Sequence, residues 1–153
     1  MAFYHLKQTQ IIPISLKKAW EFFSNPANLD EITPDDMKFV ITSPKTNEIY
    51  PGQIITYKVS PLFNIQMAWA TEITQVNVPH YFADTQLYGP YKFWHHEHHF
   101  KETASGVEVM DILYYALPFG ILGDALHALF IKKRIEEIFD YRRRKLEMLF
   151  PKR

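Results

Sequence analysis

The fold of this chain is decided by residues 121–149, ILGDALHALFIKKRIEEIFDYRRRKLEML. Apolar residues recur there at a helical period and predict one amphipathic helix. A helix of about 29 residues is roughly 43 Å long, which is too long for a connector. It must therefore pack along another layer of the protein. The predicted stripe consists of Ile131, Ile135, Ile138, Phe139, Leu146 and Leu149.

The first turns of this helix, residues 121–130, are apolar nearly all round. A helix without a polar face is usually buried on several sides. We therefore expect this end to be enclosed by the protein or to help close a cavity.

Before the helix, residues 37–115 carry short β-branched and aromatic runs separated by turn signals such as Pro51-Gly52, Gly89-Pro90 and Ser105-Gly106. Short links between successive strands favour antiparallel hairpins. The predicted strands are 37–42, 53–60, 65–77, 80–88, 91–101 and 107–115.

The N-terminal part adds a strand at residues 2–12 and two short helices. Ser15 is a typical N-cap for the first helix, at 17–23, and residues 28–33 form a second helical turn before Pro34. The order predicts one α+β domain over 1–153: a curved antiparallel sheet of about seven strands, with the long helix across its concave face.

Composition excludes several classes of protein. The chain has 17 basic and 17 acidic residues, so nothing global favours nucleic acid. It has no cysteine, no N-terminal signal layout, and no stretch near the roughly 18 apolar residues that span a bilayer. We expect a cytoplasmic monomer or weak homodimer.

Basic residues concentrate at 130–153, which suits a solvated helix end or an anionic partner.

Three stretches resemble a known family: KKAWEFFSNPANLDEITPDDMKF at 17–39, GPYKFWHHEHHF at 89–100, and DILYYALPFGILG at 111–123, which is followed by IFDYR at 138–142. They are similar to the START-like superfamily, which includes polyketide cyclases/dehydrases and lipid-transport proteins. The closer likeness is to a bacterial branch described as cell-division-inhibitor-like. The resemblance implies a helix-grip fold around a small hydrophobic ligand, but it implies neither which ligand nor whether a reaction occurs.

The most distinctive motif is the histidine cluster around Glu97. Alternate residues of a strand share a face, so Trp94, His96, His98 and Phe100 form one row, which we predict to face inward. Asp111 is the only charge in the inner row of the next strand. If Phe100 pairs with Val107, then His96 faces Asp111.

A rival register around Gly89-Pro90 places Asp84 opposite His96, and the sequence does not choose between the two. The pair would be a satisfied polar contact, a device that orients a ligand, or an acid/base pair. His96 and His98 offer two imidazoles on one face, but the sequence reveals no third ligand nearby. We therefore expect neither a metal nor a cofactor.

The aromatic and aliphatic side chains that we predict to face inward would form either the wall of a cavity or an ordinary core. Arg142 falls within the apolar helix stripe, so it must pair with an acid, reach the helix edge or anchor a ligand carboxylate. The candidate ligand-binding residues are Tyr57, Trp69, Trp94, His96, His98, Asp111, Leu113, Tyr115, Ile135 and Arg142.

Three functions remain open. The first, which we favour over catalysis, is binding or carrying a small hydrophobic molecule such as a lipid, a polyketide or an aromatic compound. The second is a cyclase or dehydratase that uses His96 with Asp111 or Asp84. The third is a protein-interaction domain that acts through the basic helix end at Arg143 and Arg144.

Overall fold

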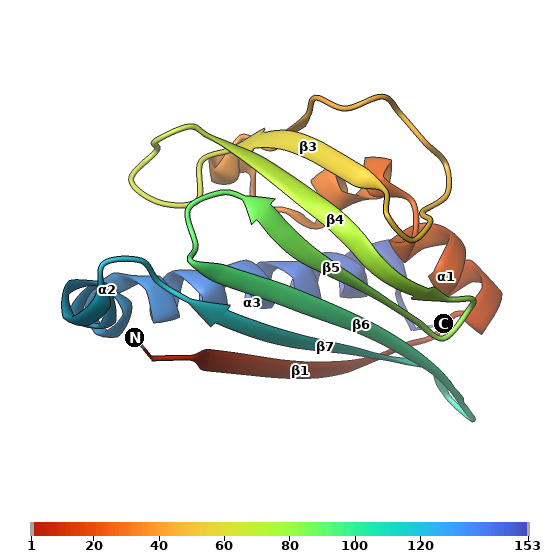
Figure 1. The fold of residues 1–153 in the computed structure, drawn as a ribbon. Coiled ribbons are helices and arrows are strands. Elements are labelled where there is room, and N and C mark those ends of the chain that lie inside the picture. Colours follow the sequence, from red (N-terminus) through yellow and green to blue (C-terminus); the bar gives the residue numbers. More distant parts are fainter. Residues whose placement is uncertain (1, 153) are drawn as a thin grey trace.

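A computed structural model describes residues 2–152 and shows a seven-stranded antiparallel sheet with a long C-terminal helix along one face (Figure 1). The strand order is β1-β7-β6-β5-β4-β3-β2, so the first strand pairs with the last. The strands are β1 (Tyr4–Ile12), β2 (Val40–Ile41), β3 (Ile54–Val59), β4 (Met67–Asn77), β5 (Tyr81–Tyr88), β6 (Phe93–Thr103) and β7 (Gly106–Ala116). The predicted helix-grip fold is confirmed, although β2 is shorter than expected.

Two short helical elements follow β1, as predicted, and a third single turn adds to them. In α1 (Leu16–Phe23), the Ser15 side chain accepts a hydrogen bond from the Lys18 backbone N–H. The 3₁₀ helix η1 (Pro26–Ile32) is capped in the same way by Asn25, and η2 (Asp35–Met37) follows directly. Both caps satisfy N–H groups that a helix start leaves unpaired.

The alternation of buried and exposed residues along the strands gives the sheet its inner face. In β7, Val107, Val109, Asp111, Leu113 and Tyr115 are all buried. Gly106 starts this strand with φ +133°, and a Cβ atom there would collide with the carbonyl of Ile12. This position therefore requires glycine where β7 begins beside the end of β1.

The core is divided into separate groups rather than one continuous mass. One group surrounds Phe82, Phe100 and Leu146, and a second joins Leu113 to Ile135 and Phe139. A third contains Val59 and Trp69. The helix is thus held by packing at several points, which leaves room for a cavity between them.

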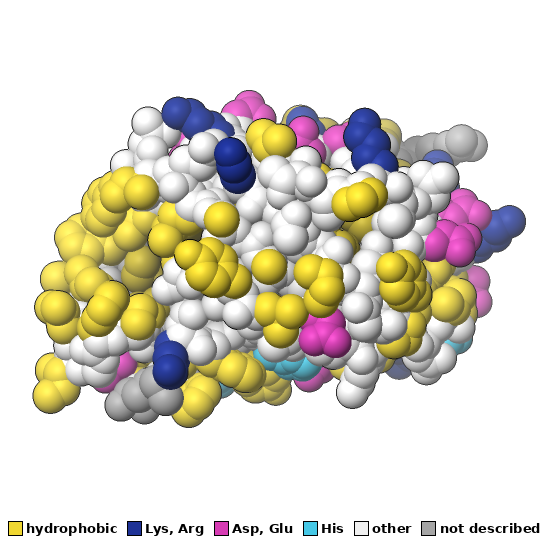
Figure 2. Space-filling model, turned by 45° about the horizontal axis from the view of Figure 1, so that its top comes forward, with side chains coloured by type: hydrophobic (Ala, Val, Ile, Leu, Met, Phe, Trp, Pro, Cys, Tyr) yellow, Lys and Arg dark blue, Asp and Glu magenta, His cyan; other side chains and the backbone are white. Residues whose placement is uncertain are grey.

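The C-terminal helix consists of α2 (Gly120–Leu126), a π-helical turn η3 (His127–Ile131) and α3 (Lys132–Leu149). The expectation that residues 121–130 are enclosed is wrong: Ile121 is 89% exposed and Leu129 is 68% exposed. The reason is geometric, because these turns extend past the ends of β1 and β7 (Figure 1). Hydrophobic side chains gather at this end of the surface (Figure 2).

Within residues 2–152, we find no helix with the length and apolar character needed to cross a bilayer.

The C-terminal helix is packed on the sheet along α3 and exposed in its first turns. This contrast can be tested by truncating one leucine of β7 that lies beneath α3 and one leucine of the exposed turns. Leu113 is fully buried beneath α3, so Leu113→Ala should lower the free energy of unfolding by about 2–5 kcal/mol. Leu129→Ala should change it by less than about 0.5 kcal/mol. Urea denaturation followed by circular dichroism measures both values. A large loss for Leu129→Ala would mean that the first turns are packed after all.

Candidate functional site

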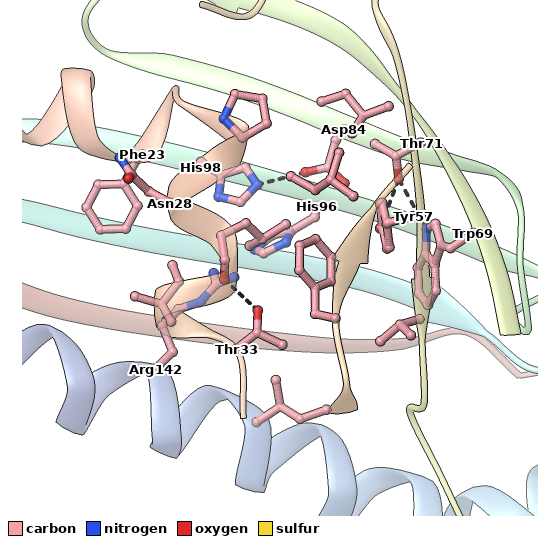
Figure 3. A pocket seen from close by; sticks show the side chains of 18 of the residues that line it. Phe23, Asn28, Thr33, Tyr57, Trp69, Thr71, Asp84, His96, His98 and Arg142 are labelled. Atoms are coloured by element: carbon pink, nitrogen blue, oxygen red, sulfur yellow. Dashed lines mark hydrogen bonds and ion pairs between the residues drawn. The ribbon is translucent and has the colours of Figure 1, made fainter. Parts of the chain in front are cut away.

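A cavity of about 180 Å³ lies between the inner face of the sheet, the segment from α1 to η2, and α3 (Figure 3). This volume is below the roughly 300–1,000 Å³ of a common ligand pocket. It is close to the roughly 150 Å³ of an engineered cavity that accepts benzene. The side chains around it are mainly apolar, and they include Phe23, Leu29, Ile32, Met37, Phe39, Ile55, Val59, Ile73, Phe82 and Ile138.

Aromatic rings form one wall. Tyr57 and Trp69 are register partners on β3 and β4, and their rings stack with centroids 5.7 Å apart. The Trp94 ring meets the Trp69 ring edge-on, with centroids 5.3 Å apart. It also contacts the Tyr91 ring in a tilted arrangement, with centroids 4.6 Å apart. The Trp69 Nε1–H donates to Thr71 Oγ1 at 3.1 Å. Because Thr71 accepts from this N–H, the indole of Trp69 adds mainly apolar surface to the wall.

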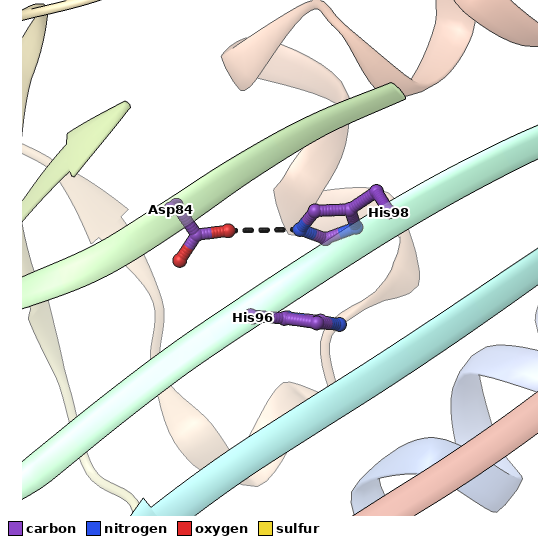
Figure 4. Close-up of side chains that lie close together, drawn as sticks. All are labelled: Asp84, His96 and His98. Carbon is purple, nitrogen blue, oxygen red and sulfur yellow. Dashed lines mark hydrogen bonds and ion pairs between the residues drawn. The ribbon is translucent and has the colours of Figure 1, made fainter. Parts of the chain in front are cut away.

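A buried polar cluster forms the opposite side. His96 Nε2 donates to Asp111 Oδ1 at 2.8 Å. His98 Nε2 donates to Asp84 Oδ2, also at 2.8 Å, as Figure 4 shows. His98 Nδ1 lies 3.3 Å from the same Asp111 oxygen. Arg142 Nη1 donates to Asp111 Oδ1 at 3.2 Å. Four side chains from the sheet and one from α3 therefore share one network.

The strand register differs from the predicted one. Phe100 pairs with Val109 instead of Val107, so His98 stands opposite Asp111 and His96 stands opposite Leu113. A slip of two residues keeps every side chain on its face, which is why the inner row is correct while the partners change. The contact between His96 and Asp111 exists, but it is diagonal.

The other predicted pairing, Asp84 opposite His96, is confirmed. Asp84 stands opposite His96 across β5 and β6, yet its carboxylate accepts from His98. Asp84 thus joins the polar cluster through its hydrogen bond with His98.

Electrostatics set the charges in the cluster. Burial favours the neutral form of Asp111, but the Arg142 charge and the two imidazoles hold its pKa well below the usual value. Burial also opposes charge on Asp84, and the His98 hydrogen bond overcomes it and lowers that pKa. Burial disfavours the imidazolium of His98, but Asp111 and Asp84 outweigh it and raise the pKa. These directions describe two carboxylates held ionised by the Arg142 guanidinium and by an imidazole, His98, whose protonation they favour in turn.

His96 behaves differently from its neighbour. Burial and the adjacent His98 lower its pKa to about 4, although Asp111 acts in the opposite direction. The ring is therefore neutral near pH 7, and the bond to Asp111 assigns its proton to Nε2. In this neutral ring Nδ1 therefore carries the lone pair.

The structure brings most predicted residues to the cavity: Tyr57, Trp69, Trp94, His96, His98, Ile135 and Arg142. Asp111 lies behind the imidazoles. Leu113 and Tyr115 do not line the cavity, because α3 crosses β7 there and packs Ile135 and Phe139 onto them. The Tyr115 hydroxyl lies 2.8 Å from His127 Nε2 instead.

Part of the lining was not predicted. Several residues between 22 and 39 also line the cavity, and the sequence analysis did not predict this. The apolar side chains of the two short helical elements could have indicated it. A third potential metal ligand was also missed: Asp84, His96 and His98 each offer one donor atom, and these atoms lie within 4.8 Å of one another. The sequence analysis named Asp84 only as a possible partner of His96, because the pairing of its strand with β6 was undecided.

No model of a known protein family matches the chain, and no curated protein matches it either. Solved structures do match in fold. The di-domain ARO/CYC BexL from the BE-7585A biosynthetic pathway is 15% identical with a TM-score of 0.74, over 99% of this chain and 51% of that one. Protein CV1439 from Chromobacterium violaceum is 9% identical with a TM-score of 0.72, over 97% and 99%. The major latex-like protein 151 from Panax ginseng is 13% identical with a TM-score of 0.69, over 98% and 99%.

These identities show a shared fold. The chain is a helix-grip protein, built as a curved sheet around a long C-terminal helix.

The polar cluster predicts a stability effect. Arg142→Ala leaves the buried Asp111 carboxylate without its guanidinium partner, so the free energy of unfolding should fall by on the order of 3 kcal/mol. Arg144→Ala, an exposed position on the same helix, should change it by less than about 0.5 kcal/mol. Chemical denaturation of both variants checks this. Equal stability of the two would show that Arg142 does not neutralise Asp111.

Proposed function

We propose that this protein binds a small apolar molecule, about the size of one or two rings, that carries a polar group. The observation that carries the proposal is the cavity of about 180 Å³, which has aromatic faces on one side and one buried polar cluster on the other. Sites for small molecules are commonly apolar with a few convergent polar groups. The volume favours a compact ring compound over a long acyl chain.

The two sides of the cavity suit different parts of such a ligand. Trp69, Tyr57 and Trp94 offer ring faces for an aromatic or alicyclic body. His96, His98 and Asp84 lie where the polar group of the ligand would point. Burying that group without a partner would be costly, so the cluster selects ligands that carry one.

Family likeness supports the same function. The sequence resembles the START-like superfamily in three stretches, and one protein of the same fold is the ARO/CYC BexL. We extend to this chain a role in binding an aromatic or polyketide-like molecule.

The binding proposal can be tested with indole as a probe and matched tryptophan substitutions on α3. Ile138 lines the cavity, so Ile138→Trp should fill it and weaken indole binding at least about tenfold. Met148→Trp, at a position 68% exposed on the same helix, should leave affinity unchanged. Isothermal titration calorimetry measures both, and circular dichroism verifies folding. The proposal fails if indole does not bind the native protein, or if it binds both variants equally.

A second function, acid/base catalysis of the cyclase or dehydratase type, is favoured by the pairing of His96 with Asp111. A neutral imidazole with a free Nδ1, oriented through its other nitrogen by a carboxylate, is the arrangement of a general base.

Native mass spectrometry of protein from its own host would identify the bound molecule for a test of this second function. Incubating that molecule with the protein would reveal any turnover. His96→Ala should then lower the rate by about 10²–10⁴-fold while binding persists. Chemistry that is unchanged in His96→Ala would rule this role out.

A further inference from the structure

We propose that the polar side of the cavity is a binding site for a divalent transition-metal ion, with Asp84, His96 and His98 as its protein ligands. The inference is independent of the organic ligand proposed above, because it rests on the donor atoms and can be tested with the metal alone.

The ligand set follows from the sheet. His96 and His98 are two residues apart on β6, so both imidazoles project from the inner face. Asp84 is the register partner of His96 on β5 and projects from the same face. One donor atom from each residue lies within 4.8 Å of the others; the His98 ring points toward Asp84, and the His96 ring lies beside that of His98 (Figure 4). The His96 and His98 rings pack against each other with centroids 3.9 Å apart, so both would rotate to bind one ion.

Asp111 identifies which nitrogens would bind the ion. Its Oδ1 is 2.8 Å from His96 Nε2 and 3.3 Å from His98 Nδ1, so it engages one nitrogen of each ring. The remaining nitrogens are His96 Nδ1 and His98 Nε2. A metal-binding histidine usually donates its other N–H to a carboxylate, and Asp111 occupies that position for both rings. Arg142 in turn holds Asp111 in place.

The remaining nitrogens are available to an ion. His96 bonds to Asp111 through Nε2, which leaves the lone pair of its neutral ring on Nδ1. His98 Nε2 faces Asp84 Oδ2 at 2.8 Å, a contact in which an ion would replace the shared proton. A metal-binding imidazole is neutral, so with both rings as ligands the two carboxylates outnumber the Arg142 guanidinium, and this net negative charge favours a cation.

The donor types narrow the choice of metal. Two imidazoles and one carboxylate suit Zn²⁺, Co²⁺, Ni²⁺ or Fe²⁺, whereas Ca²⁺ and Mg²⁺ favour sites built from oxygen alone. Three protein ligands leave at least one coordination position open. Since the three residues line the cavity, that position would face it and would accept water or an oxygen of a bound molecule.

The test uses the full chain without an affinity tag, stripped of metal with a chelator. Calorimetry with Zn²⁺ and the visible absorption of added Co²⁺ should show one ion per chain. His98→Ala and the nearly isosteric Asp84→Asn should each weaken binding by at least about 100-fold. Asp111→Asn should weaken it by about 10–100-fold, since it would act through the imidazoles.

The matched control is the outer face of β6, where His95 and His99 flank Glu97 and form a surface cluster that could also chelate metal. The double variant His95→Ala/His99→Ala should retain the ion at full affinity. The proposal is overturned if the native protein binds neither ion, if binding survives in both folded Asp84→Asn and His98→Ala, or if it is lost only in the outer-face variant. Indole binding without metal binding would overturn this inference and leave the proposed function intact.

Discussion

The buried negative charge of Asp111 is the constraint around which the polar side of the cavity is organised. Its carboxylate lies on β7 and contacts two imidazoles from β6 and a guanidinium from α3. A carboxylate removed from water needs such partners, because burial without them is costly. Asp111 therefore helps to orient both histidines and binds α3 to the sheet through Arg142. One side chain thus links the sheet, the helix and the candidate site.

The cavity exists because the helix is held at separated points. Leu146 packs with Phe100 near one end, and Ile135 and Phe139 pack on Leu113 further along. The aromatic wall and the polar cluster lie between these contacts and the short helical elements. Protein interiors are normally close-packed, so an unfilled region lined with both rings and polar atoms points to a binding role.

Much of the fold was predictable because the signals were periodic. The strand alternation placed Trp94, His96, His98 and Phe100 on the inner face, and the 3.6-residue stripe placed Ile135 and Phe139 against the sheet. Pair identities were not predictable. Period-two alternation is unchanged by a slip of two residues, so Phe100 could pair with Val107 or Val109 equally well. The joint role of Asp84 with both histidines depended on a second register, that of β5 against β6, which the sequence also left open.

The π-helical turn at His127–Ile131 separates α2, whose apolar side chains are largely exposed, from α3, whose apolar stripe faces the sheet. An α-helix rotates by about 100° per residue, so the extra residue of a π turn shifts the phase of α2 relative to α3. The outward apolar surface before the turn and the inward stripe after it are therefore out of register with each other. Residue changes on the exposed surface of this tip should therefore leave in place the side chains of α3 that line the cavity.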